Sequence, residues 1–270
     1  MSMEYGVRLK IADTVFEIIS PALIPISWIE KNYKAFLCSA AADYKVFITF
    51  GKEKKGGSIF TKKGTSPRKN RSVPFSYQGN LFDISIDFPG RKAEVFAGGN
   101  SGIIGILRFV SSAVLVKNGG FLLHAASLVH DGFGYVFAGP SGSGKTTICR
   151  FSKNKTALSD ETTAVVKNGK GYRVYATPFA GELGQVKKNT SARLKAIFFI
   201  HKGEDFRHAC VNRACAIANL FRNCILDFAD YTMTDTLFDT FCTVSQKIPG
   251  YDLYFKPEPR LWGYIDGRIN

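Results

Sequence analysis

The strongest chemical signal in the sequence is a short glycine-rich stretch that fits the pattern G-x-x-x-x-G-K-[ST]. Its glycines allow a tight, partly left-handed backbone path, along which N–H groups turn inward and surround an anion. We expect an apolar strand before the stretch and a helix after it, and the helix N-terminus adds to the same cradle. The pattern therefore predicts a loop that binds the phosphates of a purine nucleoside triphosphate, ATP with Mg²⁺. The loop consists of Gly139, Pro140, Ser141, Gly142, Ser143, Gly144, Lys145, Thr146 and Thr147.

Two side chains at the end of this loop have distinct expected roles. We expect the Lys145 ammonium to reach the β- and γ-phosphates as a flexible point charge, and the Thr146 hydroxyl to bind Mg²⁺. The loop alone does not select an activity. A similar string is found in transporter ATPases, but their L-S-G-G-Q signature is absent from this sequence.

An acidic pair, Asp160-Glu161, follows Lys145 by 15 residues (160 − 145 = 15). This spacing leaves room for a short helix, a turn and a strand, a topology that returns the chain beside the phosphate loop. One carboxylate can then help to hold Mg²⁺, and the other can accept a proton from an incoming hydroxyl. The alternative is a solvated turn after a strand, where Asp and Glu are common.

A histidine and a further acid stand near these motifs in the sequence. His124 lies in the apolar run Leu-Leu-His-Ala-Ala-Ser-Leu-Val, just before the strand that leads into the phosphate loop. Such a histidine can equally be a satisfied core residue. Glu182 closes the string Thr-Pro-Phe-Ala-Gly-Glu after another predicted strand, and it is a second candidate carboxylate.

Together these strings resemble the HPr serine kinase/phosphorylase family. The likeness runs over about residues 100–265 and includes L-H-A-A-S-L-V, G-P-S-G-S-G-K-T-T, L-S-D-E, T-P-F-A-G-E and the tail V-S-Q-K-I-P-G-Y-D-L-Y-F-K-P-E-P. Within that group, the sequence looks more like the kinase-related proteins found outside the HPr system. The resemblance implies an α/β fold with a mixed, strongly twisted sheet, the P-loop core that HPr kinases share with phosphoenolpyruvate carboxykinase.

The resemblance also implies roles for individual residues. Asp160 would be the general base that activates a serine hydroxyl, or the acid in the reverse reaction. His124 would lie near the γ-phosphate, so the implied catalytic set is Asp160, His124 and Lys145. Glu161 and Glu182 would join Thr146 at the metal.

The remaining sequence predicts the elements that position these residues. Residues 1–100 are predicted to form a β-rich region of unknown role, and residues 101–270 a kinase-like domain. Strands are expected at Tyr5–Lys10, Thr14–Ile19, Tyr44–Phe50, Phe82–Phe88, Lys92–Phe96, Phe121–Val129, Gly134–Ala138, Thr156–Ser159, Ala164–Val166, Tyr172–Ala176, Leu194–His201 and Tyr251–Lys256. Helices are expected at Ser101–Val116, from Lys145, at Cys210–Asp227 and at Asp235–Ser245.

Composition limits the class of protein and its partners. The chain has 270 residues, 45% of them apolar, and a net charge of +14, much of it in the basic segment 51–72. Because that segment has no aromatic residues spaced for base stacking, we interpret it as a solvated loop, with an acidic partner as the alternative and nucleic acid disfavoured. Six cysteines without paired metal-ligand spacing indicate free, mostly buried thiols. No apolar run approaches the roughly 18 residues of a membrane span. We therefore expect a cytoplasmic protein.

The leading hypothesis from the sequence is an ATP- and Mg²⁺-dependent kinase. It would transfer the γ-phosphoryl group to a hydroxyl, on the serine of a protein or peptide or on free serine. The alternative is a nucleotide-binding switch or assembly module that uses the same loop without transfer chemistry. The sequence does not identify the phosphoryl acceptor, the oligomeric state, a reverse phosphorylase activity or the role of segment 51–72.

Overall fold

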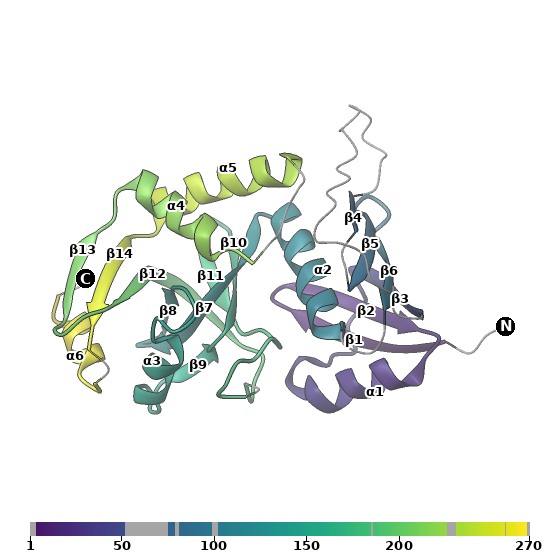
Figure 1. The fold of residues 1–270 in the computed structure, drawn as a ribbon, viewed down its shortest axis with the longest axis horizontal. Coiled ribbons are helices and arrows are strands. Elements are labelled where there is room, and N and C mark those ends of the chain that lie inside the picture. Colours follow the sequence, from purple (N-terminus) through teal and green to yellow (C-terminus); the bar gives the residue numbers. More distant parts are fainter. Residues whose placement is uncertain are drawn as a thin grey trace. The chain divides into compact units, whose positions relative to one another are not determined.

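The computed structural model describes residues 4–51, 75–78, 81–98, 102–184, 186–225, 231–256 and 258–268. Within these residues the chain is a mixed α/β protein with two mixed sheets and six α-helices (Figure 1). It divides into two compact units, Met1–Val114 with Asp227–Tyr231, and Leu115–Leu226 with Thr232–Asn270. The predicted basic loop 51–72 lies, apart from Gly51, outside the described residues.

The first unit contains a six-stranded sheet in the order β1-β2-β3-β6-β5-β4. Strands β2, β3 and β6 are parallel, and antiparallel partners extend the sheet on both sides. The expected alternation of buried and exposed residues is present in β6, which packs one face on a core. The strands are β1 (Tyr5–Ile11), β2 (Thr14–Ser20), β3 (Tyr44–Gly51), β4 (Phe75–Gln78), β5 (Phe82–Asp87) and β6 (Lys92–Gly98).

Helix α1 (Leu23–Asn32) also belongs to this unit and was not expected from the sequence. Its Pro25 lies in the first turn, where a missing N–H costs no helical hydrogen bond. A short 3₁₀ turn (Lys34–Phe36) follows. Helix α2 (Ile103–Lys117) lies close to the predicted bounds, and its Phe109 ring packs 4.6 Å from that of Tyr77 in β4.

The second unit contains an eight-stranded sheet in the order β11-β10-β7-β8-β12-β14-β13, with β9 beside β7. Because β11 also pairs with β12, the strands β11, β10, β7, β8 and β12 close into a ring. The strands are β7 (Gly120–His130), β8 (Phe133–Ala138), β9 (Thr156–Ser159), β10 (Thr162–Asn168), β11 (Gly171–Tyr175), β12 (Ser191–Lys202), β13 (Arg207–Cys210) and β14 (Gly250–Phe255).

Four helices accompany this sheet (Figure 1). They are α3 (Lys145–Phe151), α4 (Arg213–Asn223), α5 (Tyr231–Lys247) and α6 (Leu261–Asp266). The helix expected from Cys210 begins instead at Arg213, because residues 207–210 pair with β14 and the Asn212 side chain caps the helix by accepting from Cys215 N. Helix α6 was not expected. Its Trp262 is buried against β8 and donates from Nε1 to Ser152 Oγ at 2.8 Å.

The structure overturns the prediction that the thiols are mostly buried. All six cysteines are free. Cys149 is buried, and burial raises the pKa of the Cys224 thiol as well, but the other four are exposed or only partly buried, so the prediction of mostly buried thiols is wrong. Cys210 lies on the edge strand β13 and Cys215 on the outer face of α4, and both are exposed.

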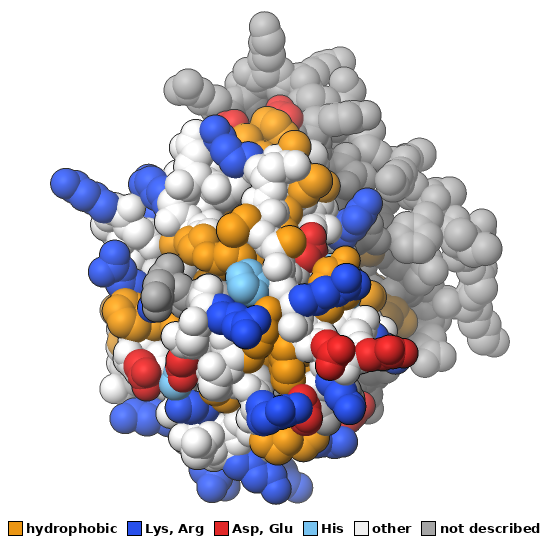
Figure 2. All heavy atoms as spheres, turned by 90° about the vertical axis from the view of Figure 1, so that its left-hand side faces the viewer, with side chains coloured by type: hydrophobic (Ala, Val, Ile, Leu, Met, Phe, Trp, Pro, Cys, Tyr) orange, Lys and Arg blue, Asp and Glu red, His pale blue; other side chains and the backbone are white. Residues whose placement is uncertain are grey.

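On the face shown in Figure 2, Lys and Arg side chains are scattered among apolar and acidic ones. Within the described residues, no helix combines the length and apolar character that a membrane crossing needs.

Candidate active site

The glycine-rich loop lies between β8 and α3, so the predicted order of strand, loop and helix is present. Gly142 (φ 75°) and Gly144 (φ 109°) adopt left-handed conformations that favour glycine. A Cβ at Gly139 would lie 2.7 Å from Ser143 Oγ, and one at Gly144 would lie 2.6 Å from the Phe255 ring. The glycines therefore allow both the backbone path and its close packing.

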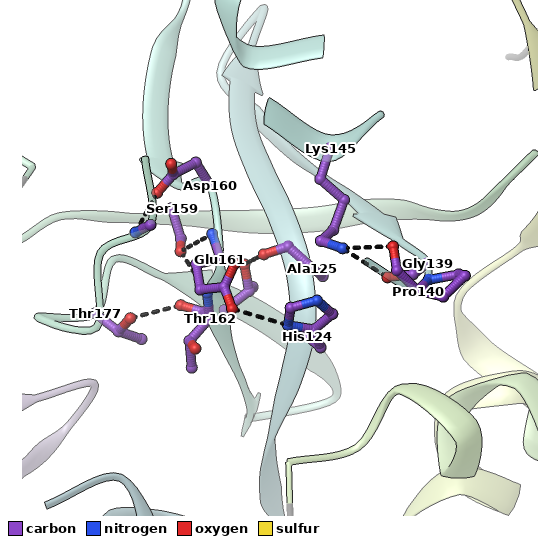
Figure 3. Close-up of polar contacts among 12 residues, drawn as sticks. His124, Ala125, Gly139, Pro140, Lys145, Ser159, Asp160, Glu161, Thr162 and Thr177 are labelled. Atoms are coloured by element: carbon purple, nitrogen blue, oxygen red, sulfur yellow. Dashed lines mark hydrogen bonds and ion pairs between the residues drawn. The ribbon is translucent and has the colours of Figure 1, made fainter. Parts of the chain in front are cut away.

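Lys145 is buried, and its ammonium turns back into the loop (Figure 3). The Nζ atom donates to the carbonyl oxygens of Gly139 and Pro140, at 2.8 Å each. Burial lowers the pKa of Lys145 from its ordinary value, and the negative charge of Glu161 partly offsets that effect. The ammonium thus forms its hydrogen bonds with neutral oxygens, while the charge of Glu161 lies near enough to act on it.

Ser143 provides a second polar group in the loop. Its Oγ atom is buried and has no hydrogen-bond partner within the described residues. An unsatisfied buried hydroxyl costs about 1–3 kcal/mol, so a ligand that supplies an acceptor oxygen here would recover that loss. Thr146 and Thr147, in the first turn of α3, are partly exposed, whereas Ser141 and Gly142 are exposed at the outer edge of the loop.

Strand β7 separates the phosphate loop from the acidic pair by one strand width. Ala125 pairs on one side with Ala138, the last residue of β8, and on the other side its N–H donates to the Glu161 carbonyl at 3.1 Å. Strands β9 and β10 both pair with β7, at 127–129 and 120–124, so the acidic pair falls at the break between them. With strands about 4.8 Å apart, the loop and the acidic pair lie on the order of 10 Å from each other along the sheet.

Asp160 is buried, and its carboxylate is held by the loop that follows β11. Its Oδ1 accepts from Gly181 N at 2.9 Å, and its Oδ2 accepts from Leu183 N at 2.8 Å. A Cβ at Gly181 would lie 2.8 Å from Oδ2, so glycine is needed for this approach. Both oxygens retain a second lone pair for another donor.

Glu161 and His124 form a pair beside Asp160, and their side chains point toward each other in Figure 3. His124 Nδ1 lies 3.2 Å from Glu161 Oε1, and both side chains are partly exposed. His124 comes from β7, where its register partner is Thr162, the residue after Glu161. The histidine is therefore not a core residue with an apolar environment; it faces a carboxylate next to the phosphate loop.

The Glu182 side chain contacts Arg150 and not the pair of Glu161 and His124. Its Oε2 atom is 3.2 Å from Arg150 in α3, and both side chains are exposed. Glu182 nevertheless belongs to the same short loop whose N–H groups hold Asp160. The structure thus brings Lys145, Glu161 and His124 together with Asp160, and keeps Glu182 at the margin.

Several groups that build this site were not identified in the sequence. They include the N–H groups of Gly181 and Leu183, the Arg150 guanidinium, and Thr177, whose hydroxyl donates to the Thr162 carbonyl. The glycine inside Thr-Pro-Phe-Ala-Gly-Glu is the signal that could have revealed the close approach to Asp160. Backbone donors leave no trace in residue type, and the contacts of Arg150 and Thr177 depend on segments that are distant in the sequence.

The arrangement can bind a phosphorylated anion and place two carboxylates and an imidazole beside it. The Thr146 hydroxyl and the Glu161 carboxylate are oxygen ligands of the kind that Mg²⁺ prefers. Asp160 and Glu161 are acceptors that can take a proton from a hydroxyl.

Comparisons with known proteins match the chain to a family model and to distant solved structures. A family model described as SynChlorMet cassette protein ScmC matches residues 103–269, which is more than half of the chain. No curated protein matches the sequence. Among solved structures, the Hpr(Ser) kinase/phosphatase from Coxiella burnetii aligns with a TM-score of 0.32 and 10% identity, over 54% of this chain and 93% of that chain. An alignment this distant does not identify a shared activity.

Proposed function

The chain belongs to the ScmC family of SynChlorMet cassette proteins, and we propose that it is an ATP- and Mg²⁺-dependent kinase that phosphorylates a hydroxyl. The proposed acceptor is the serine of a protein or peptide, or free serine, and the proposed core is of the HPr kinase and phosphoenolpyruvate carboxykinase type. One observation carries the proposal. Ala125 has the start of the phosphate loop on one side and the acidic pair on the other, so a bound triphosphate would face both carboxylates.

The residues of the loop fit the phosphates of ATP. The buried Ser143 hydroxyl has no partner within the described residues, and the glycines at 139 and 144 let the loop backbone pack where a Cβ would clash with Ser143 and Phe255. Phosphate oxygens would replace the two carbonyl oxygens as acceptors for Lys145, and a buried ammonium gains more from a charged acceptor than from neutral ones. Backbone N–H groups at the start of α3 would complete the contact.

The proposed metal site uses the carboxylates nearest the loop. Thr146 and Glu161 would hold Mg²⁺, with Glu182 able to join if it leaves Arg150. A bound Mg²⁺ would neutralise charge on the β- and γ-phosphates. The contact with His124 would orient the Glu161 carboxylate and leave its second oxygen for the metal.

The transfer itself requires a base, a phosphoryl group and a leaving group in line. The acceptor oxygen would form a bond to the γ-phosphorus while the bond from that phosphorus to the β–γ bridging oxygen breaks, and ADP departs. Asp160 would accept the hydroxyl proton on a lone pair that Gly181 and Leu183 leave free. Lys145 would offset the charge that develops on the bridging oxygen, and His124 would orient the γ-phosphate or the acceptor.

The test separates binding from chemistry. The Asp160→Asn variant should lose phosphoryl transfer from γ-labelled ATP to L-serine and to serine-containing peptides by about 100-fold or more, since a base contributes roughly 10²–10⁴ in rate. ATP affinity should stay within about threefold, because Asp160 does not belong to the phosphate loop. Lys145→Ala should instead lose ATP binding. Full transfer by Asp160→Asn would exclude Asp160 as the base.

One observation favours a second function, a nucleotide-binding switch without transfer. Both Asp160 oxygens accept backbone N–H bonds, so this carboxylate has a structural use in holding the loop around Gly181. On that account the wild-type protein binds Mg-ATP but forms no phosphorylated serine, peptide or protein. If the wild-type protein forms any such product and a Lys145 variant does not, the protein is a kinase.

A further inference from the structure

A cavity of about 700 Å³ lies at the far end of β8 from the phosphate loop. Phe133, the first residue of β8, lines this cavity, whereas the phosphate loop follows Ala138, the last residue. With about 3.4 Å per residue along a strand, the two ends of β8 lie about 17 Å apart. The cavity is therefore separate from the candidate active site, although both belong to the second unit.

Four cationic side chains line this cavity, and none of the lining residues is acidic. They are Lys170, Arg193, Lys195 and Lys247, from the β10–β11 turn, from β12 and from the end of α5. Among the described residues, none of the four pairs with a carboxylate within 4 Å. The Lys247 ammonium donates instead to the Lys170 carbonyl, at 3.1 Å.

The strand register places a fifth cation next to these four. Arg173 in β11 lies directly opposite Arg193 in β12, in an antiparallel pair whose facing side chains share one side of the sheet. Like charges at facing positions destabilise a sheet. The Arg173 guanidinium bonds to Ser191 and not to a carboxylate. An anion in the cavity would relieve this repulsion.

Apolar side chains line the rest of the cavity. Tyr172, Leu194 and Ile248 are buried beneath it, and Phe133 is 37% exposed at its margin. The Lys195 ammonium lies 5.4 Å from the centre of the Phe133 ring, so cationic and aromatic groups are adjacent. An inorganic polyanion would pair with the cations but would leave the apolar surface exposed to water.

We propose that this cavity binds an acidic peptide segment that carries an apolar side chain. The carboxylates would pair with Arg193, Lys195 and Lys247, and the apolar side chain would cover Phe133. A cavity of this volume is of the size that holds small ligands or a few residues of peptide, and its concave form is unsuited to a nucleic-acid duplex. The inference does not depend on kinase activity, because it concerns binding without nucleotide.

The experiment measures fluorescence anisotropy of a short fluorescein-labelled peptide with acidic residues around one central leucine. The full chain should bind it at low salt and lose affinity with added salt. The double variant Arg193→Gln with Lys195→Gln should bind about tenfold more weakly, since two ion pairs are removed. Lys31→Gln with Lys34→Gln removes the same charge from the first unit, and it should bind like the wild type.

Two further comparisons keep the result interpretable. The charge-preserving variant Arg193→Lys with Lys195→Arg should retain binding within about threefold, which shows that charge at these positions, and not damage to β12, controls affinity. Replacing the leucine of the peptide by serine should weaken binding. Equal binding of the leucine and serine peptides, equal binding by Arg193→Gln with Lys195→Gln, or no binding at low salt would each overturn the proposal.

Discussion

At the scale of single residues, Lys145 has the clearest physical signature. It is a buried ammonium whose hydrogen bonds go to two backbone carbonyl oxygens, and burial lowers its pKa. A phosphate in the loop would satisfy the charge that burial penalises. Binding of an anion and protonation of Lys145 should therefore favour each other.

This coupling gives a prediction for pH. Because ATP binds the charged form, its affinity should fall as the pH rises toward the pKa of Lys145. Since that pKa is lowered, the fall should begin at a lower pH than for an exposed lysine. Calorimetric titration with ATP at increasing pH measures the effect.

The matched control for this prediction is Lys145→Arg, because a guanidinium remains charged at every pH used. If it still binds ATP, its affinity should show no such alkaline loss. Lys145→Ala should cost about 2–3 kcal/mol of ATP binding, the value of charge-assisted hydrogen bonds. An identical pH dependence in the wild type and in Lys145→Arg would exclude Lys145 as the source.

Cys149, in the helix after the phosphate loop, supports a second prediction at this scale. Burial, with a smaller contribution from the charge of Asp160, raises the pKa of its thiol to about 12. Iodoacetamide at pH 8 should therefore modify the exposed Cys210 and Cys215 and leave Cys149 unmodified until the protein unfolds. Mass spectrometry of the digested protein measures the extent of modification at each cysteine.

The same shift affects stability. An unfolded cysteine ionises near pH 9, whereas folded Cys149 stays neutral to about pH 12. The neutral thiol of Cys149 therefore stabilises the folded protein. This contribution to the free energy of unfolding should be complete below pH 9 and should decline as the pH rises toward 12. Modification of Cys149 at the rate of Cys210 in the folded protein would contradict the burial.

At the scale of elements, the candidate site depends on how β7 joins the acidic pair to the phosphate loop. The sequence predicted β7, β8, the loop and the start of α3, because an apolar run, three glycines and Lys-Thr each have a local cause. It could not predict the backbone bonds from Gly181 and Leu183 to Asp160, which form only when a distant loop returns to β9.

The contact between the loop around Gly181 and Asp160 can be tested by a substitution that adds one methyl group. In Gly181→Ala the new Cβ would lie 2.8 Å from Asp160 Oδ2 and 2.9 Å from Glu161 Cβ, so the loop must shift. We expect a loss of about 1–3 kcal/mol in the free energy of unfolding, measured in urea, and reduced transfer activity. Gly263→Ala is the control, since its Cβ meets nothing within 4 Å in helix α6. Equal stability of the two variants would show that the close approach is not required.

At the scale of the whole molecule, the family match covers residues 103–269, and the candidate active site and the cationic cavity lie within that range. Much of the +14 charge lies in segment 51–72, which the sequence predicted to be a solvated loop, with an acidic partner as the alternative. The described residues include this segment only at Gly51. The cationic cavity could not be foreseen, because its cations come from a turn, a strand and a helix end that are distant in sequence. The pairing of β11 with β12 brings two of these segments together, and the end of α5 adds Lys247.

The central claim is that the loop and the acidic pair together transfer a phosphoryl group. The most direct measurement is ³¹P NMR of the wild-type protein with Mg-ATP, L-serine and a serine-containing peptide. We predict that ADP and a phosphoserine signal appear together, that both are absent with Asp160→Asn, and that this variant still binds ATP. Unchanged ATP in every wild-type sample, despite tight binding, would contradict the kinase and leave a nucleotide-binding module.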